Sequence, residues 1–466
     1  MAEGNITVFK RQLNLPETVA MSVALMAPTT GMVFVTPLLA SAAGYNVPLA
    51  FVVSLVGILI IGFSFGRLAR KYAHAGSAYG LTKDTLGPRT GLLAGWGLMF
   101  TYTLLIAALL AGTGAFAQLT LLEFFHINAP WGLFALLGAG IVLMLAIHNI
   151  RPSMRLMLVL EAISMAAVVV VCVLIIGHSH LTASTSVKPF ILNNRGMSGI
   201  AHALVFGLTS FLGFEGSATL GEESKDPKRM VRIAIIVSAL VGGLFFVFVS
   251  YSQTVGFGLS AKGVADFSSQ LTPFNTLTER FLNTNFAAVI NLGAAISFFS
   301  CALAAVNAGS HILFALSRDG YVPQTLGTLD EHSNVPRRAI AVVFPVGLAL
   351  LGLGWILWTS PVTVIGNLSG LGTFGALVSY GLVVVGSLRS YWLSDVAERK
   401  FHVIILQILG LGVLFYVLYG NIYPVPPSPV NLFPYITLAY FLATMSFSLY
   451  YKQRREVPVV SVEAAA

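Results

Sequence analysis

Long, nearly uninterrupted apolar segments dominate this chain, and they constrain its fold more than any other feature. A helix needs about 20 predominantly apolar residues to cross a lipid bilayer. Twelve segments meet that need, at about 18–42, 48–69, 91–121, 130–148, 155–177, 198–222, 231–257, 285–316, 339–358, 362–388, 402–421 and 433–451. Their apolar residues are continuous rather than alternating, which disfavours a membrane β-barrel. The sequence therefore predicts an all-α membrane protein with twelve transmembrane helices.

The composition excludes the main alternatives to a membrane protein. Charged residues make up 9% of the chain, whereas soluble proteins carry roughly 25%. A chain of 466 residues with so few charges cannot cover a large solvated surface, which argues against a soluble enzyme or a disordered protein. The two cysteines, Cys172 and Cys301, lie inside apolar runs, so neither a disulfide framework nor a metal site is predicted.

The basic residues are distributed unequally between the two sets of loops. Of the 26 Lys and Arg residues, 22 fall in loops and span ends on one side. The other side holds Lys188, Arg195, Lys262 and Arg280. Because basic loops stay in the cytoplasm, this asymmetry predicts a multi-pass protein of the cytoplasmic membrane with both termini inside the cell. It also accounts for the net charge of +8 without a nucleic-acid partner.

Two spans contain residues that interrupt helices, at matching places in the two halves of the chain. The first span includes Ala27–Met32 with Pro28 and Gly31, and the sixth includes Phe211–Ser217 with two glycines around a carboxylate. Spans 1–5 and 6–10 begin on opposite sides, so a five-helix unit repeated there has inverted topology, as in many secondary transporters. The alternative is a proline kink with close helix packing. An unwound segment exposes N–H groups for a carboxylate and carbonyls for an ammonium group.

Three motifs resemble those of the amino acid–polyamine–organocation (APC) superfamily of transporters. The loop Lys71–Gly80 resembles that family's Pro-x-x-Gly-Gly-x-Tyr, with Ala73 in place of the proline and Ser77 in place of the second glycine. The segment from Glu215 to Arg229 resembles the sixth helix and its exit. The segment from Asn307 to Pro323 resembles the eighth helix and the following loop, with His311 where an arginine is usual.

The resemblance implies a LeuT-type fold in a single transporter domain: a 5+5 inverted repeat plus two further helices. Repeat one would cover about 18–177, repeat two about 198–388, and the two added helices about 402–451. The family implies alternating access of an amino acid or amine. By resemblance, Thr29, Thr30 and Gly31 would hold the substrate carboxylate, although the family's usual Gly-Ser-Gly is replaced here. Phe211 and Gly213 would offer carbonyls to the amino group, and Phe211 or Phe214 would serve as an aromatic gate.

Two acids, Glu161 and Glu215, fall well inside predicted spans. Ionisable groups in a bilayer are costly and therefore functional candidates, and a buried carboxyl can exchange a proton as its surroundings change. We predict a proton-coupling role for them. The alternatives are a structural carboxyl at Glu215, and for Glu161 a pairing with His311 or Arg155. A sodium site would need hydroxyls on the eighth span, which Ser297 and Ser300 supply, although such serines more often bond to their own helix.

The predicted function is secondary active transport of an amino acid by proton-coupled symport or exchange. The predicted partners are a small-molecule substrate, a proton (or sodium) and the lipid bilayer. Alternatives are an importer of a small amine or polyamine, or a sodium-coupled carrier; a polyamine needs at least two carboxylates. An enzyme is not predicted, because Gly62–Gly66 and Gly370–Gly375 match a nucleophile elbow and a dinucleotide fingerprint only inside apolar spans. No cofactor is predicted. A channel would differ from a carrier in showing flux that does not saturate.

Overall fold

The computed structural model describes residues 9–72, 76–148, 150–179, 181–270, 272–394 and 401–456. The regular elements named in these ranges are helices, and Leu13 and Ser224 form an isolated bridge. Ala73, which replaces the proline of the loop motif, lies outside the described residues.

The helices follow the apolar segments of the sequence. The first half contains α1 (Leu15–Met26), α2 (Pro28–Phe34), α3 (Thr36–Ala43), α4 (Val47–Lys71), α5 (Ala78–Leu86), α6 (Pro88–Phe125), α7 (Trp131–Ala146), α8 (Ile150–His178) and α9 (Ala183–Val187). The second half contains α10 (Gly196–Thr209), η3 (Gly216–Thr219), α11 (Pro227–Phe257), α12 (Ala261–Ser269), α13 (Pro273–Phe281), α14 (Thr284–Arg318), α15 (Arg337–Leu357), α16 (Pro361–Trp392), α17 (Phe401–Gly420) and α18 (Phe433–Glu456).

Nine helical stretches in the described part of the chain are long and apolar enough to cross a membrane. This confirms the prediction of an all-helical, multi-pass membrane protein. The other predicted spans coincide with shorter apolar helices, α7 and α10, and with the interrupted first span. Left-handed Ala27 before Pro28 separates α1 from α2, and Val35 separates α2 from α3, so length alone does not identify this span.

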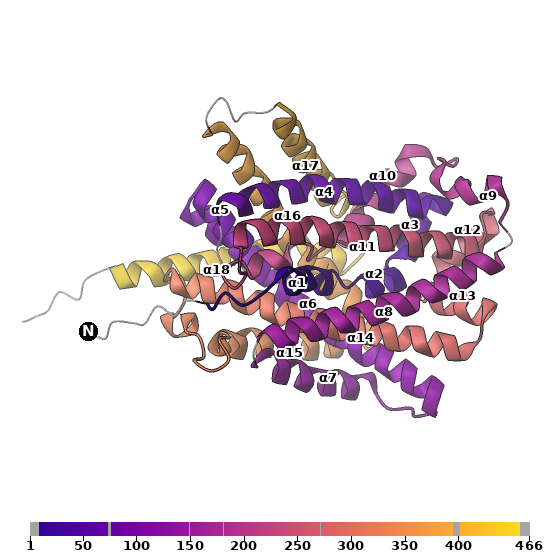
Figure 1. Cartoon of the computed structure of the whole chain (residues 1–466), viewed down its shortest axis with the longest axis horizontal. Coiled ribbons are helices and arrows are strands. Elements are labelled where there is room, and N and C mark those ends of the chain that lie inside the picture. Colours follow the sequence, from indigo (N-terminus) through magenta and orange to yellow (C-terminus); the bar gives the residue numbers. More distant parts are fainter. Residues whose placement is uncertain are drawn as a thin grey trace, which may run out of the picture.

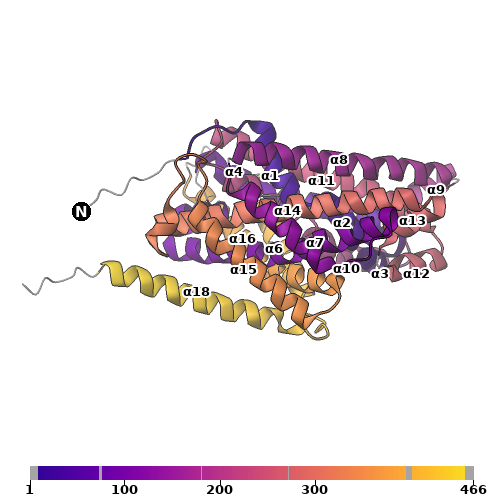
Figure 2. The ribbon, with the colours of Figure 1, turned by 90° about the horizontal axis from the view of Figure 1, so that it is seen from below.

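Helix α6 runs through the centre of the bundle and packs most extensively against α14 and α16. Its contact with α16 brings two backbones together. A Cβ at Gly97 would lie 2.7 Å from the Gly375 carbonyl oxygen, and a Cβ at Gly375 would lie 2.4 Å from the Gly97 carbonyl oxygen. Small residues such as glycine permit the backbones of two helices in a bilayer to approach this closely. Helices α17 and α18 lie on the outside of the bundle (Figures 1 and 2).

The two ends of the molecule differ in the charges that they carry. The C-terminal end of α18 and the segment that leads into α1 lie toward the left in Figure 1, and the short helices α9, α12 and α13 lie at the opposite end. The helix ends at the first of these ends carry Lys83, Arg89, Arg151, Arg155, Arg318, Arg337 and Lys452, whereas the opposite end carries Lys188, Arg195, Lys262 and Arg280. The ion pairs at the first end join Glu17 to Arg151 and Arg155, Lys83 to Asp319, Glu222 to Arg318, and Asp330 to Arg337. We call this the basic end.

Candidate functional site

The predicted interruption of the first span is confirmed, and it falls on Ala27. This residue has φ 46° and ψ 65°, in the left-handed region, between the end of α1 and Pro28 at the start of α2. Helix α2 continues into α3 through right-handed Val35, whose N–H donates to the Gly31 carbonyl at 2.9 Å. Because the first N–H groups of a helix have no partner within it, the amides of Thr29 and Thr30 are left for other acceptors.

The sixth span is interrupted as predicted, between the end of α10 at Thr209 and the start of η3 at Gly216. Gly213 has φ +96°, a conformation that favours glycine. A Cβ at this position would lie 2.7 Å from the side chain of Leu25 and 2.8 Å from its carbonyl. Glycine therefore lets the two interrupted segments touch directly.

The backbone carbonyls of the sixth-span interruption differ in whether they already accept a backbone hydrogen bond. The Phe211 carbonyl accepts from Phe214 N–H at 3.1 Å, and the Gly213 carbonyl accepts from Gly216 N–H at 2.8 Å. Both were predicted to face an amino group, and both already accept a backbone donor. In the described chain, no backbone N–H outside the regular helices donates a hydrogen bond to the Ser210 carbonyl.

A cavity of about 390 Å³ lies at the two interruptions. It is lined by Leu25, Met26, Ala27, Thr30, Gly31, Val35, Leu38, Leu105, Leu109, Val205, Phe206, Thr209, Ser210, Leu212, Phe298, Cys301, Ile365, Gly366, Asn367, Ser369, Gly370, Thr373, Asn421, Val430 and Phe433. We call it the central cavity. None of these described lining residues is charged. It runs from the interruption of the first span to the loop between α17 and α18.

The central cavity brings together some of the predicted residues and not others. Thr30 and Gly31 line it, whereas Thr29, Phe211, Gly213 and Phe214 do not. The Phe211 ring is fully buried against Phe246 of α11, 4.9 Å between ring centroids. The Phe214 ring is fully buried against Phe65 and Tyr380. The aromatic rings that do line the cavity include Phe206 and Phe298.

Thr29 faces helix α8 and the acid that the sequence singled out there. Its Oγ1 lies 2.9 Å from Ser164 Oγ, and its backbone amide faces the Glu161 carboxyl. Ser297 Oγ of α14 donates to Glu161 Oε1 at 2.9 Å. The other carboxylate oxygen, Oε2, is buried and has no hydrogen-bond partner among the described residues.

Helix α14 carries the two serines proposed for a sodium site, and only one of them has a described partner. Ser297 donates to Glu161, while the buried Ser300 Oγ has no partner in the described part of the chain. Next to them, Cys301 Sγ donates to the Leu25 carbonyl at 3.1 Å. Leu25 and Cys301 also line the central cavity, so the Glu161 cluster and the cavity share a wall.

Glu215 is fully buried between three helical segments. Tyr102 of α6 donates to its Oε1 at 2.8 Å, and Tyr380 of α16 donates to its Oε2 at 2.5 Å. The Tyr380 hydroxyl in turn accepts from Gly213 N–H at 3.3 Å. Glu215 therefore ties the sixth-span interruption to α6 and α16, behind the wall of the central cavity.

At the basic end, the segment before α1 contacts the residues that follow η3 and helix α14. The amides of Gln12 and Leu13 donate to the Glu223 carbonyl at 2.9 and 3.0 Å. His311 Nε2 lies 2.5 Å from Glu223 Oε1, and the Phe9 ring stacks on the imidazole with centroids 5.2 Å apart. His311 thus pairs with Glu223 and not with Glu161.

Arg155, the other partner predicted for Glu161, instead bonds to Glu17. Its Nε lies 3.0 Å from Glu17 Oε1, and Arg151 Nε lies 3.2 Å from the same atom. Burial alone raises the pKa of Glu17, but the Asn14 amide and the two arginines outweigh it and hold this pKa below its usual value. Glu17 precedes the first predicted span and fixes α8 to the start of α1.

Several cavity residues were not singled out from the sequence. Ser210 directly precedes the predicted interruption, and that adjacency was a usable signal. Asn367 carries the one amide side chain of segment 362–388, and its buried Nδ2 has no partner among the described residues. Phe298 carries no sequence signal, because an aromatic residue in an apolar helix is usual.

The chain is similar in sequence to several known transporters. The low-affinity putrescine importer PlaP of Escherichia coli (strain K12) is 24% identical over 404 residues, covering 83% of this chain and 82% of its own. The branched-chain amino acid permease BcaP of Bacillus subtilis (strain 168) is 26% identical, covering 76% of each chain. The methylthioribose transporter of the same bacterium is 22% identical, covering 90% of each. The amino acid permease profile matches residues 18–455, so the chain belongs to the amino acid permease family.

Proposed function

We propose that this protein is a secondary active transporter for an amino acid with an uncharged, largely apolar side chain. The observation that carries this proposal is the central cavity, which lies at both interruptions and has no charged side chain in its described lining. A zwitterion needs no charged partner if exposed backbone groups satisfy both of its ends. A diamine such as putrescine has two ammonium groups and no carboxylate, so an uncharged cavity holds it poorly.

Our proposed binding mode uses the backbone of the two interruptions. The substrate carboxylate lies at the first turn of α2, where Thr30 and Gly31 line the cavity and Thr30 N–H has no partner within the helix. The substrate ammonium group lies at the Ser210 carbonyl, in place of the Phe211 and Gly213 carbonyls. Thr29 supports α2 from behind through Ser164. The substrate side chain lies against Leu105 and Phe298.

We further propose the twelve-span, 5+5 inverted-repeat arrangement, with repeats at about 18–177 and 198–388, two added helices at about 402–451, and both termini in the cytoplasm. Its support is that the interruptions at Ala27 and Gly213 fall in the first helix of each half. The excess of Lys and Arg on one side supports the orientation. The central cavity reaches from the interruption of the first span to the loop between α17 and α18, and alternating access would open such a site to one side of the membrane at a time.

For energy coupling, we propose that Glu161 carries a proton. It lies beside the Thr29 amide, shares a wall with the central cavity, and has one oxygen without a described partner. Glu215 has a tyrosine hydroxyl on each oxygen, an arrangement that suits a fixed structural carboxyl. The alternative is a sodium ion among Glu161, Ser297 and Ser300, since carboxylate and hydroxyl oxygens also suit a cation.

The decisive experiment is uptake by the purified full-length protein in liposomes with an imposed pH gradient. Neutral amino acids, putrescine and methylthioribose are compared at equal concentration, with and without sodium. We expect saturable uptake of one or more neutral amino acids that depends on the pH gradient and not on sodium. Preference for putrescine or methylthioribose would refute the substrate assignment. Absence of any carrier-mediated uptake or exchange would refute the transport assignment.

A further inference from the structure

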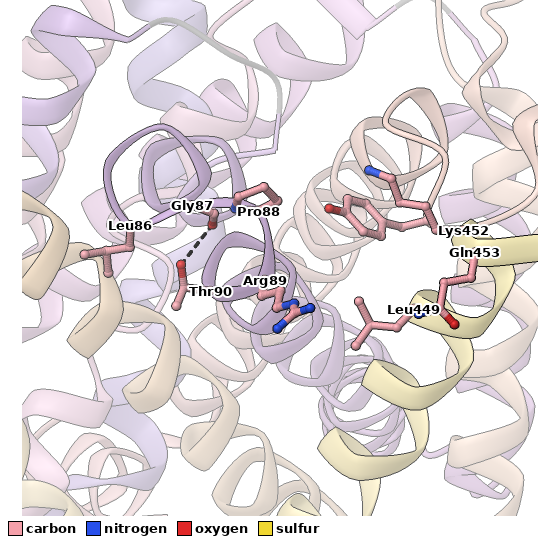
Figure 3. A pocket seen from close by; sticks show the side chains of 9 residues that line it. Leu86, Gly87, Pro88, Arg89, Thr90, Leu449, Lys452 and Gln453 are labelled. Carbon is pink, nitrogen blue, oxygen red and sulfur yellow. Dashed lines mark hydrogen bonds between the residues drawn. The ribbon is translucent and has the colours of Figure 1, made fainter. Parts of the chain in front are cut away.

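A second pocket, of about 440 Å³, lies at the basic end of the molecule (Figure 3). It is formed by the turn between α5 and α6, by Tyr321, and by the last turns of α18. Its lining residues are Leu86, Gly87, Pro88, Arg89, Thr90, Tyr321, Leu449, Lys452 and Gln453. None of them lines the central cavity. We call it the basic-end pocket.

Two cations from different helices line the basic-end pocket, and its described lining includes no acid. Arg89 projects from the first turn of α6 toward α18 (Figure 3). Lys452 of α18 places its Nζ 4.3 Å from the centroid of the Tyr321 ring. Neither side chain takes part in an ion pair recorded for the described residues. Two cations around one hollow, neither of them neutralised by a described acid, create a positive potential that attracts an anion.

The other polar groups of the pocket contribute less. Thr90 Oγ1 donates to the Gly87 carbonyl at 2.9 Å, the dashed contact in Figure 3. Its proton is therefore already used within the turn. Gln453 is neutral and exposed. The charge complementarity of the site is therefore set by Arg89 and Lys452.

The position of the pocket indicates where the anion comes from. The start of α6 and the end of α18 are both ends of candidate membrane spans, the level at which lipid headgroups lie. Leu86 and Leu449 add apolar surface. On the outer face of α18, Phe447 and Tyr450 are 50% and 55% exposed, so an apolar surface suited to acyl chains continues away from the pocket.

We propose that the basic-end pocket binds the phosphodiester headgroup of an anionic phospholipid from the adjoining leaflet. The two cations hold the phosphate, and the acyl chains lie along α18. The lipid links α18, which lies outside the bundle, to the start of the central helix α6. This site is independent of the transported substrate.

The proposal can be tested by native mass spectrometry of the delipidated full-length protein. Binding of phosphatidylglycerol and phosphatidylcholine is measured for the wild type and for the double variant Arg89→Gln/Lys452→Gln. The control is Lys228→Gln/Arg229→Gln, which removes two exposed positive charges from the start of α11, outside the pocket. A third titration uses inorganic phosphate alone, followed by thermal unfolding.

We expect the pocket variant to bind phosphatidylglycerol about 10-fold more weakly, with phosphatidylcholine binding unchanged, because each cation near an anionic headgroup contributes measurably. The control should bind both lipids as the wild type does. Unchanged phosphatidylcholine binding also shows that the variant is folded. Equal losses in the two double variants would refute the site. Equal affinity of the wild type for both lipids would also refute the site. Stabilisation of the wild type by inorganic phosphate equal to that by phosphatidylglycerol would refute it too, because it would indicate a site for a soluble anion.

Discussion

The Tyr380 hydroxyl lies 2.5 Å from Glu215 Oε2 and also accepts the Gly213 N–H, at 3.3 Å. One hydroxyl of α16 therefore satisfies both a backbone amide freed by the sixth-span interruption and a fully buried carboxyl next to it. Buried polar groups left without partners are costly. Glu215 and Tyr380 thus hold the interrupted segment in one conformation while α10 on one side and η3 on the other remain regular.

Replacing Tyr380→Phe should destabilise the protein and slow transport. The change leaves Glu215 Oε2 and Gly213 N–H without the hydroxyl, at a cost of about 1–3 kcal/mol. Thermal unfolding in detergent and initial uptake rates measure the two effects. The control is Tyr450→Phe, which removes a hydroxyl from a side chain that is 55% exposed. Equal stability of the two variants would show that the Tyr380 hydroxyl contributes nothing to the interruption.

Replacing Glu161→Gln should abolish the dependence of uptake on external pH while leaving substrate exchange largely intact. The amide keeps an acceptor for Ser297 but cannot gain or lose a proton in this range. Uptake and exchange are measured from pH 5 to pH 8 in liposomes, with Glu215→Gln as the comparison. A flat pH profile for Glu215→Gln together with a normal one for Glu161→Gln would assign coupling to Glu215 instead. A sodium requirement lost in Ser300→Ala would support the sodium alternative.

Replacing Gly112→Ala should narrow the central cavity. A Cβ at Gly112 would lie 2.3 Å from two atoms of the Phe298 ring, so the ring must move, and it lines the cavity. We expect KM to rise more for large substrates than for small ones, by about 10-fold or more. The matched control is Gly140→Ala in α7, where an added Cβ meets nothing within 4 Å. Equal KM changes for all substrate sizes would argue against Phe298 as a wall of the site.

Replacing Glu17→Gln should destabilise the protein at neutral pH by about 1 kcal/mol. The folded-state pKa of Glu17 lies below its ordinary value of 4.5. The stabilisation by this carboxylate is therefore present above pH 4.5 and is lost as the pH falls through the lowered pKa. The difference in melting temperature between wild type and variant should shrink at lower pH. The control is the exposed Glu331→Gln, and a difference that stays constant down to pH 3 would contradict this role.

The positions of the helices and of both interruptions could be predicted from the sequence. A segment of about 20 apolar residues in a bilayer has no water to bond to its backbone N–H and C=O groups. A helix pairs these groups within the segment itself. Pro28 has no backbone N–H to donate, and Gly213 has no side chain to restrict its backbone. Both residues therefore locally disfavour a regular helix. These signals are local, and they do not depend on which helices are neighbours.

The orientation of side chains in the interruptions could not be predicted. Phe211 and Phe214 lie in a segment without helical periodicity, so no pattern indicates which side of the segment they occupy. Ring contacts of Phe211 with Phe246 and of Phe214 with Tyr380 turn them away from the central cavity. The pairing of His311 with Glu223 rather than Glu161 likewise joins residues 88 positions apart.

The sequence by itself determined that this chain is a bundle of membrane helices, interrupted at Ala27–Met32 and Phe211–Ser217, with two buried acids as candidates for coupling. Composition and local backbone chemistry suffice for that. Only the tertiary structure decided that Glu215 is held by two tyrosines and that one oxygen of Glu161 has no described partner. The reason is that hydrogen-bond partners more than 100 residues apart are selected by helix packing, which no local pattern records.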